Sequence, residues 1–211
     1  AVSDERGRIL AREETPASAS GEVAAVLALP DAPLWSPEEP RLLTASATLL
    51  RGGEALDRVE TRFGLREIEI RGNRFYLNGN RLFLRGYGDD SVYPETLAPP
   101  TDRQVYLRRL RLAKSYGFNF VRHHSHFLPD EYYDACDEVG MLVQPELPNA
   151  YQFYWDRAVG PALDLYRQEW EAAVRRYRNH PSIFDWCMGN EGYPSLAPEL
   201  YRIARELDPT R

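Results

Sequence analysis

The residues with the clearest chemical potential are an amide and a carboxylic acid that stand side by side after an apolar run. Ile183–Gly189 reads as a buried strand, and Asn190 and Glu191 follow it directly. In a β/α barrel, side chains at the C-terminal ends of the strands project into the active site. Apolar neighbours raise the pKa of a carboxyl group towards the value that a general acid needs. The pattern predicts a proton-donating Glu191 beside an Asn190 that holds a substrate hydroxyl; a carboxylate that caps the next helix would look the same.

Charged side chains also follow the ends of the other predicted strands. Arg122 and Glu146 each come at or just after a strand end, and Asp90 lies in the loop after the first strand. Arg122 is either a partner for an active-site carboxylate or a salt bridge inside the barrel mouth, and a paired arginine can serve both. Glu146 either contacts the substrate or supports a residue that does, or it makes a structural hydrogen bond to a loop. Asp90 either binds substrate hydroxyls or is a solvated loop charge.

Three of the four histidines, His123, His124 and His126, lie close together after the second predicted strand. Such a cluster raises the possibility of a zinc site. Metal hydrolases built on barrels take carboxylate and histidine ligands from several strands, however, and no His-x-His follows the first strand here. The sequence therefore predicts no metal and no cofactor.

The elements that position these residues alternate regularly from about residue 69. Asn78-Gly79 between two apolar arms predicts a hairpin with a type I′ turn, whose second arm becomes the first barrel strand. Strands are expected at 81–84, 118–122, 141–144 and 183–189, and helices near 101–116, 129–139, 166–177 and 200–207. Alternating strands and helices predict a parallel sheet with right-handed crossovers, here about half of an eight-stranded barrel.

The first 68 residues have a different pattern. Val23–Leu29 and Leu42–Leu50 read as strands separated by turn residues, which favours a β-sandwich. The segment is too short for a whole immunoglobulin-like domain of about 100 residues. We therefore expect an α/β chain with two parts, the C-terminal portion of an immunoglobulin-like sandwich at 1–68 and the first half of a (β/α)8 TIM barrel at 69–211. We also expect the chain to be a piece of a longer protein.

Composition narrows the classes of partner. The 26 basic and 32 acidic residues give a formal net charge of −6, which offers no electrostatic reason to bind nucleic acid. No apolar run approaches the roughly 18 residues of a membrane span. Cys136 and Cys187 read as small buried apolar residues more than as a disulfide pair. Assembly into a homo-oligomer and the compartment, whether periplasmic, secreted or cytoplasmic, stay open.

The residues around the Asn-Glu pair resemble a known family. Arg178–Ile183 and Gly189-Asn190-Glu191 resemble the acid/base signature of glycoside hydrolase family 2, which includes β-galactosidases, β-glucuronidases and β-mannosidases. Other stretches resemble the family in the same order along the chain: Trp35–Pro40, Arg62–Arg66, Leu77–Arg81, Leu84–Gly86, Asn119–Arg122 and Ser125–Phe127. The resemblance runs from about Trp35 to the last residue.

This resemblance implies roles for individual residues. Family members retain anomeric configuration, which requires two carboxylates about 5–5.5 Å apart. Glu191 would be the acid/base, and the nucleophile would come from a strand beyond the last residue of this chain. Arg122 would keep the nucleophile ionised, and His126 would contact the sugar. One extra residue after Arg122 leaves His124 as the alternative, while Glu146 matches a glutamate at a family strand end.

The loop Gly86–Asp90 departs from the family's Asn-Arg-His-Glu, so the sugar stays open. The resemblance implies a retaining, exo-acting β-glycosidase that hydrolyses terminal β-linked sugars, with a carbohydrate substrate. The 211 residues alone would then be inactive, because they lack the nucleophile. The alternatives are a non-catalytic carbohydrate-binding relative of the same fold and a metal-dependent barrel hydrolase.

Overall fold

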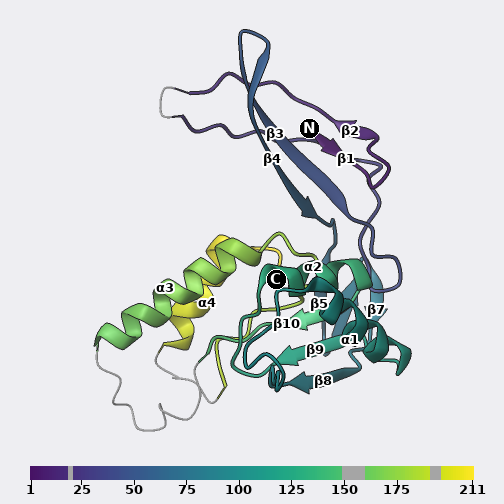
Figure 1. Cartoon of the computed structure of the whole chain (residues 1–211), viewed down its shortest axis with the longest axis vertical. Coiled ribbons are helices and arrows are strands. Elements are labelled where there is room, and N and C mark those ends of the chain that lie inside the picture. The colour runs from purple at the N-terminus through teal and green to yellow at the C-terminus, as the bar shows by residue number, and fades with distance from the viewer. Residues whose placement is uncertain (19–20, 149–159, 191–195) are drawn as a thin grey trace.

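The chain forms an N-terminal β-sheet unit and a larger α/β unit (Figure 1). The computed structural model describes residues 1–18, 21–148, 160–190 and 196–211, with the side chains of 160–162 left out. The long β3–β4 hairpin stands away from the four helices, and the C-terminus lies beside the parallel sheet.

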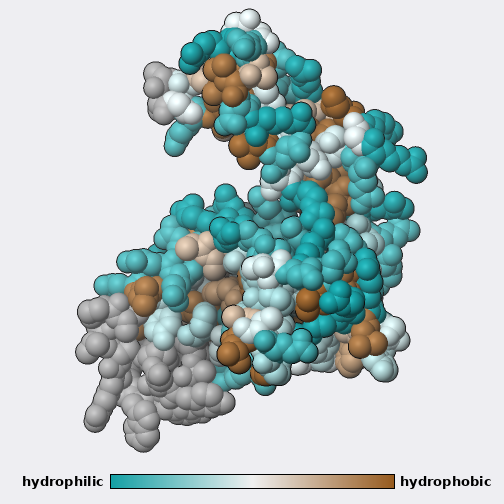
Figure 2. Space-filling view, viewed as in Figure 1, coloured by the Kyte–Doolittle hydropathy of each residue, from teal (hydrophilic) through white to brown (hydrophobic). Residues whose placement is uncertain are grey.

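The N-terminal sheet is antiparallel throughout. Its strands are β1 (Val2–Ser3), β2 (Ile9–Ala11), β3 (Leu43–Arg51) and β4 (Glu54–Phe63), in the order β2-β1-β3-β4. β3 confirms the strand that we expect at 42–50. Apolar side chains, among them Leu49 and Val59, are exposed on this unit (Figure 2).

The strand expected at Val23–Leu29 is wrong. This segment has no regular secondary structure, and the Val26 side chain is 95% exposed. A β-strand is stabilised by hydrogen bonds to a neighbouring strand, and no described strand pairs with this segment. Its apolar composition was therefore a misleading signal.

A second antiparallel sheet follows, made of β5 (Ile68–Arg71), β6 (Arg74–Leu77) and β7 (Asn80–Leu82). Asn78 and Gly79 have φ angles of 52° and 75°, as the expected type I′ turn requires. The expectation that the second arm becomes the first barrel strand is wrong, because β7 pairs only with β6 among the described strands. The chain leaves this sheet before the parallel sheet begins at Gly86.

The parallel sheet consists of β8 (Gly86–Asp89), β9 (Phe120–His123) and β10 (Leu142–Gln144), in the order β10-β9-β8. The run 183–189 is not the regular strand that we expect. It pairs with β10 and with the residues just after β10 through two isolated parallel bridges, Val143↔Ile183 and Glu146↔Cys187. Between the two bridges the chain advances three residues on the β10 side, from Val143 to Glu146, but four residues in the 183–189 run, from Ile183 to Cys187. The extra residue is a β-bulge that interrupts the ladder.

Within the described ranges, four helices alternate with these segments: α1 (Arg103–Ser115), α2 (Asp130–Val139), α3 (Gly160–Tyr177) and α4 (Ala197–Leu207). Asp102 is the N-cap of α1, and its carboxylate accepts a hydrogen bond from the Gln104 backbone. Helix α2 ends at Gly140, whose φ of 74° is the left-handed conformation that glycine adopts readily at the end of a helix. No helix of the described ranges is long and apolar enough to cross a membrane.

The core lies on both faces of the parallel sheet. On one face, Val121, Val143 and Ile183 pack against side chains of α1 and α2. On the other face, Leu142 and Phe184 pack against Trp35 from the segment that precedes β3. The indole Nε1 of Trp35, which is fully buried, donates to the Asp137 carbonyl oxygen at 2.9 Å. The two units are therefore joined by a buried contact.

Candidate active site

A buried carboxylate organises the C-terminal edge of the parallel sheet. Glu146 is 0% exposed, and its Oε2 lies 2.8 Å from Arg122 Nε and 2.6 Å from Arg122 Nη2. Its Oε1 accepts hydrogen bonds from the backbone N–H and the hydroxyl of Ser125, at 3.0 and 3.3 Å. The Glu146 carboxylate is thus held by protein donors on both oxygens. These contacts fit both a supporting role for Glu146 and a structural hydrogen bond, and its contact with a substrate stays a prediction.

Arg122 links this carboxylate to the end of the neighbouring segment. Its Nη2 also donates to Asn190 Oδ1 at 2.9 Å, and its side chain remains 40% exposed. The hydrogen bond from Arg122 to Glu146 raises the pKa of the guanidinium, so the cation is permanent. The Asn190 amide oxygen is therefore held by Arg122. The three predicted residues Arg122, Glu146 and Asn190 lie in one network.

A thiol joins the same network. Cys187 Sγ lies 3.2 Å from Glu146 Oε2 and 3.7 Å from the Gly189 carbonyl oxygen. Burial raises the pKa of this thiol to about 12, so it is protonated and acts as a donor at neutral pH. Both cysteines are free, in agreement with the sequence, but Cys187 is a polar contact as well as a small apolar side chain. Sequence reasoning missed this contact.

The histidines divide between the two faces of the sheet. His124 Nδ1 lies 3.6 Å from Glu146 Oε1, and His126 Nδ1 lies 2.6 Å from the His124 carbonyl oxygen. Both rings are partly exposed, so His124 and His126 both stay candidates for a sugar contact. His123 is fully buried against the Tyr132 ring, and burial lowers its pKa to about 4. The three rings therefore do not converge on a single point.

The two consecutive aspartates at the end of β8, Asp89 and Asp90, differ in their contacts. Asp89 accepts a hydrogen bond from the Ser91 N–H and lies 3.5 Å from Arg109 of α1. Asp90 is exposed, and its charge adds to the effect of Glu146 on the Arg122 pKa. Asp90 therefore stays a candidate ligand at the rim, whereas Asp89 is engaged by α1.

Glu191 lies outside the described residues, so its position relative to this network stays a prediction. Its neighbour Asn190 is described, and it lies beside Arg122 at the C-terminal edge.

One described group of side chains has the composition of a metal site, and it lies away from this edge. Asp134, Asp137 and His180 offer ligand atoms within 4.8 Å of one another. Asp137 already accepts from His180 Nδ1 at 2.6 Å and from the Ser182 N–H at 3.1 Å, while Asp134 pairs with Arg62 at 2.9 Å. These partners explain the cluster as a structural joint between α2 and the start of the 183–189 run.

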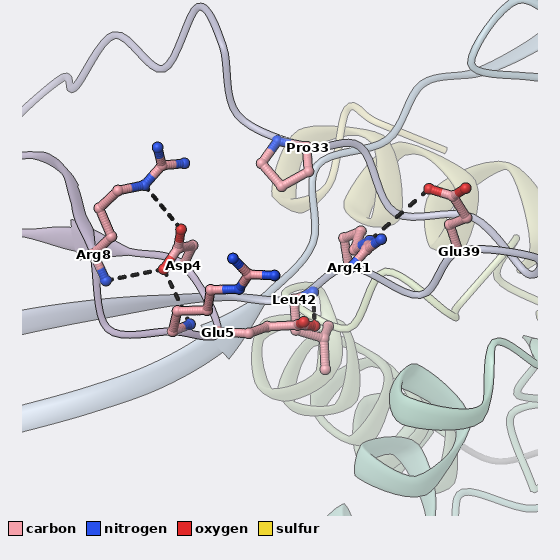
Figure 3. Close-up of a pocket in the computed structure, with 8 residues that line it drawn as sticks. Asp4, Glu5, Arg8, Pro33, Glu39, Arg41 and Leu42 are labelled. Atoms are coloured by element: carbon pink, nitrogen blue, oxygen red, sulfur yellow. Dashed lines mark hydrogen bonds and ion pairs between the residues drawn. The ribbon is translucent and has the colours of Figure 1, made fainter.

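A hollow of about 450 Å³ lies beside the N-terminal sheet (Figure 3). Among its lining residues, Asp4 pairs with Arg8 at 3.1 Å, and Arg41 lies 3.9 Å from Glu39. The remaining labelled residues are Glu5, Pro33 and Leu42. None of the predicted site residues lines this hollow.

Two family models match the chain end to end. The model described as "Glycosyl hydrolases family 2, TIM barrel domain" matches residues 68–211, and "Glycosyl hydrolases family 2" matches residues 2–66. The chain belongs to glycosyl hydrolase family 2. The family resemblance expected from the motifs is thereby confirmed, including the presence of a sandwich domain before a TIM barrel domain.

Individual relatives agree with this assignment. A β-galactosidase of Thermoanaerobacter pseudethanolicus is 32% identical over 86% of this chain and 24% of its own length. A β-galactosidase of Lactococcus lactis is 32% identical over 84% of this chain and 18% of its own length. The structure of Bifidobacterium dentium β-glucuronidase complexed with coumarin-3-O-glucuronide is 26% identical, with a TM-score of 0.87 over 99% of this chain and 36% of that one. This family 2 chain thus spans between 18% and 24% of these curated relatives.

Proposed function

We propose that the whole protein is a retaining, exo-acting β-glycosidase that hydrolyses terminal β-linked sugars. The observation that carries this proposal is the network of Arg122, Glu146 and Asn190 at the C-terminal edge of the parallel sheet. Catalytic groups of barrel enzymes lie at this edge. The relatives named as β-galactosidases and β-glucuronidases support the same class of reaction.

The proposed roles follow from position and chemistry. Glu191 donates a proton to the glycosidic oxygen and later acts as the base. Asn190 binds a hydroxyl of the sugar through its amide nitrogen, and His126 or His124 binds another. Arg122 supplies a fixed positive charge that keeps the nucleophile ionised. Asp90 binds hydroxyls at the rim.

The organisation of the chain is part of this proposal. Residues 1–68 would be part of an immunoglobulin-like sandwich, and residues 69–211 the first half of a (β/α)8 barrel. The nucleophile would come from a later strand of the whole protein, since the buried and paired Glu146 cannot serve. The 211 residues alone should therefore be inactive.

The test is hydrolysis of 4-nitrophenyl β-glycosides of galactose, glucuronic acid, glucose and mannose by the whole protein. Proton NMR of the first-formed sugar should show the β anomer. First formation of the α anomer would overturn the retaining mechanism. Binding of the same sugars without hydrolysis would support the alternative, a non-catalytic carbohydrate-binding relative.

A further inference from the structure

The contact between the Cys187 thiol and the Glu146 carboxylate depends on the β-bulge in the 183–189 run. Ile183 packs on the helix side of the sheet. Alternate residues of a regular strand share a face, so Cys187, four residues later, would point to the helix side as well. The extra residue between the two bridges reverses this order, and Cys187 instead lies 3.2 Å from Glu146.

The neighbours of Cys187 agree with this reversal. Phe184 packs on the Trp35 side of the sheet, and Gln144 Nε2 donates to Asp185 at 2.6 Å, so two successive residues face away from the α1–α2 layer. Trp186 then packs on the helix side against Trp170. The bulge thus aims one thiol at one buried carboxylate.

The donors around Glu146 come from both neighbouring segments. Arg122 and Ser125 approach from the β9 side, and Cys187 approaches from the 183–189 run. Arg122 and Cys187 share Oε2, so the thiol and the guanidinium together fix the rotation of the carboxylate group. A carboxylate that rotates would release Arg122 from the geometry in which it also reaches Asn190.

We propose that Cys187 is a positioning residue whose thiol donates to Glu146, and that Glu146 in turn aims Arg122 at Asn190 and at the reacting centre. This proposal rests on the proposed glycosidase function. The thiol does not attack the substrate, and its high pKa of about 12 keeps it protonated for this role.

The kinetic test compares Cys187→Ser, which keeps a donor, with Cys187→Ala, which removes it, both in the whole protein. A buried hydrogen bond to a charged group corresponds to roughly tenfold or more in rate, so Cys187→Ala should lower kcat by about tenfold or more with little change in KM. Cys187→Ser should stay within about threefold of the wild type.

Cys136→Ala is the matched control, because Cys136 is a fully buried cysteine on α2 that contacts none of Glu146, Arg122 and Asn190 in the described structure. Its kcat should not change.

Two kinetic outcomes would overturn the proposal. Cys187→Ala with wild-type kcat would show that the donor is not needed. Equal losses for Cys187→Ser and Cys187→Ala would show that the site needs the volume of sulfur and not a hydrogen bond.

A spectroscopic test does not depend on activity. The infrared S–H stretching band of Cys187 is isolated by subtracting the spectrum of Cys187→Ser from that of the wild type. A thiol bonded to a carboxylate absorbs at lower frequency than a free one, and Glu146→Gln should shift the band upward. A band at the free-thiol frequency that Glu146→Gln leaves unchanged would refute the contact. Failure of the wild type to hydrolyse any glycoside would instead refute the proposed function, whatever the band shows.

Discussion

Replacing Gly140 with alanine should weaken the contact between the Trp35–Pro40 segment and helix α2. Gly140 has a φ of 74°, and a Cβ there would lie 2.4 Å from the Pro37 carbonyl oxygen and 2.9 Å from Pro37 Cα. Left-handed backbone costs an L residue about 1–2 kcal/mol, and overpacking adds about 1–3 kcal/mol. The free energy of unfolding should therefore fall by about 2–5 kcal/mol. The clash is with backbone that also accepts a hydrogen bond from Lys114 Nζ, so it cannot be relieved by a side-chain rotation.

Gly117 provides the matched control for this substitution. It follows helix α1 with a φ of 90°, and no atom lies within 4 Å of a Cβ built on it. Gly117→Ala should therefore cost only the conformational part, about 1–2 kcal/mol. Urea unfolding of the whole protein, followed by tryptophan fluorescence, measures both variants. Equal losses for the two substitutions would refute the close approach of Pro37 to Gly140.

Two further predictions concern pH. Burial lowers the pKa of His123 from 6.5 to about 4. As the pH falls from 6.5 to 4, this histidine is protonated in the unfolded chain before it is protonated in the folded one, so the free energy of unfolding decreases over this pH range. The wild type should lose about 3 kcal/mol more than His123→Phe between neutral pH and pH 4 in urea unfolding, and identical losses would contradict this. Burial also raises the pKa of Asp185 above 3.8, so its charged form destabilises the fold as pH rises. Asp185→Asn, which can still accept from Gln144, should raise the melting temperature at pH 7 more than below pH 3.8, and equal shifts would contradict the account.

Local sequence signals predicted the turns and the alternation of elements. Asn78-Gly79 and Gly140 each adopt the positive φ angles that their sequence context requires, because these preferences depend on a few bonds only. The Val23–Leu29 strand could not be judged in this way, since a strand forms only where another strand pairs with it. The bulge in the 183–189 run was equally hidden, because it is defined by pairing with β10 and its extension.

The sequence allowed a prediction of which side chains lie near one another at the sheet edge, but not of how they pair. The ends of adjacent parallel strands lie at one edge, so Arg122, Glu146 and Asn190 could be expected together. The sequence could not show that Glu146 is fully enclosed by its donors, because burial depends on the packing of three segments. Cys187 was missed because regular alternation places it on the helix side, and only the bulge turns it towards Glu146.

The acid role of Glu191 is the central claim, and its dependence on the leaving group tests it most directly. Glu191→Gln in the whole protein removes the proton, which contributes about 10²–10⁴-fold to the rate. The value of kcat/KM reports the first bond cleavage, and it should fall by about this factor for alkyl β-glycosides. For 2,4-dinitrophenyl β-glycosides, whose leaving group needs no proton, it should fall far less. Equal losses for the two kinds of substrate would contradict the account.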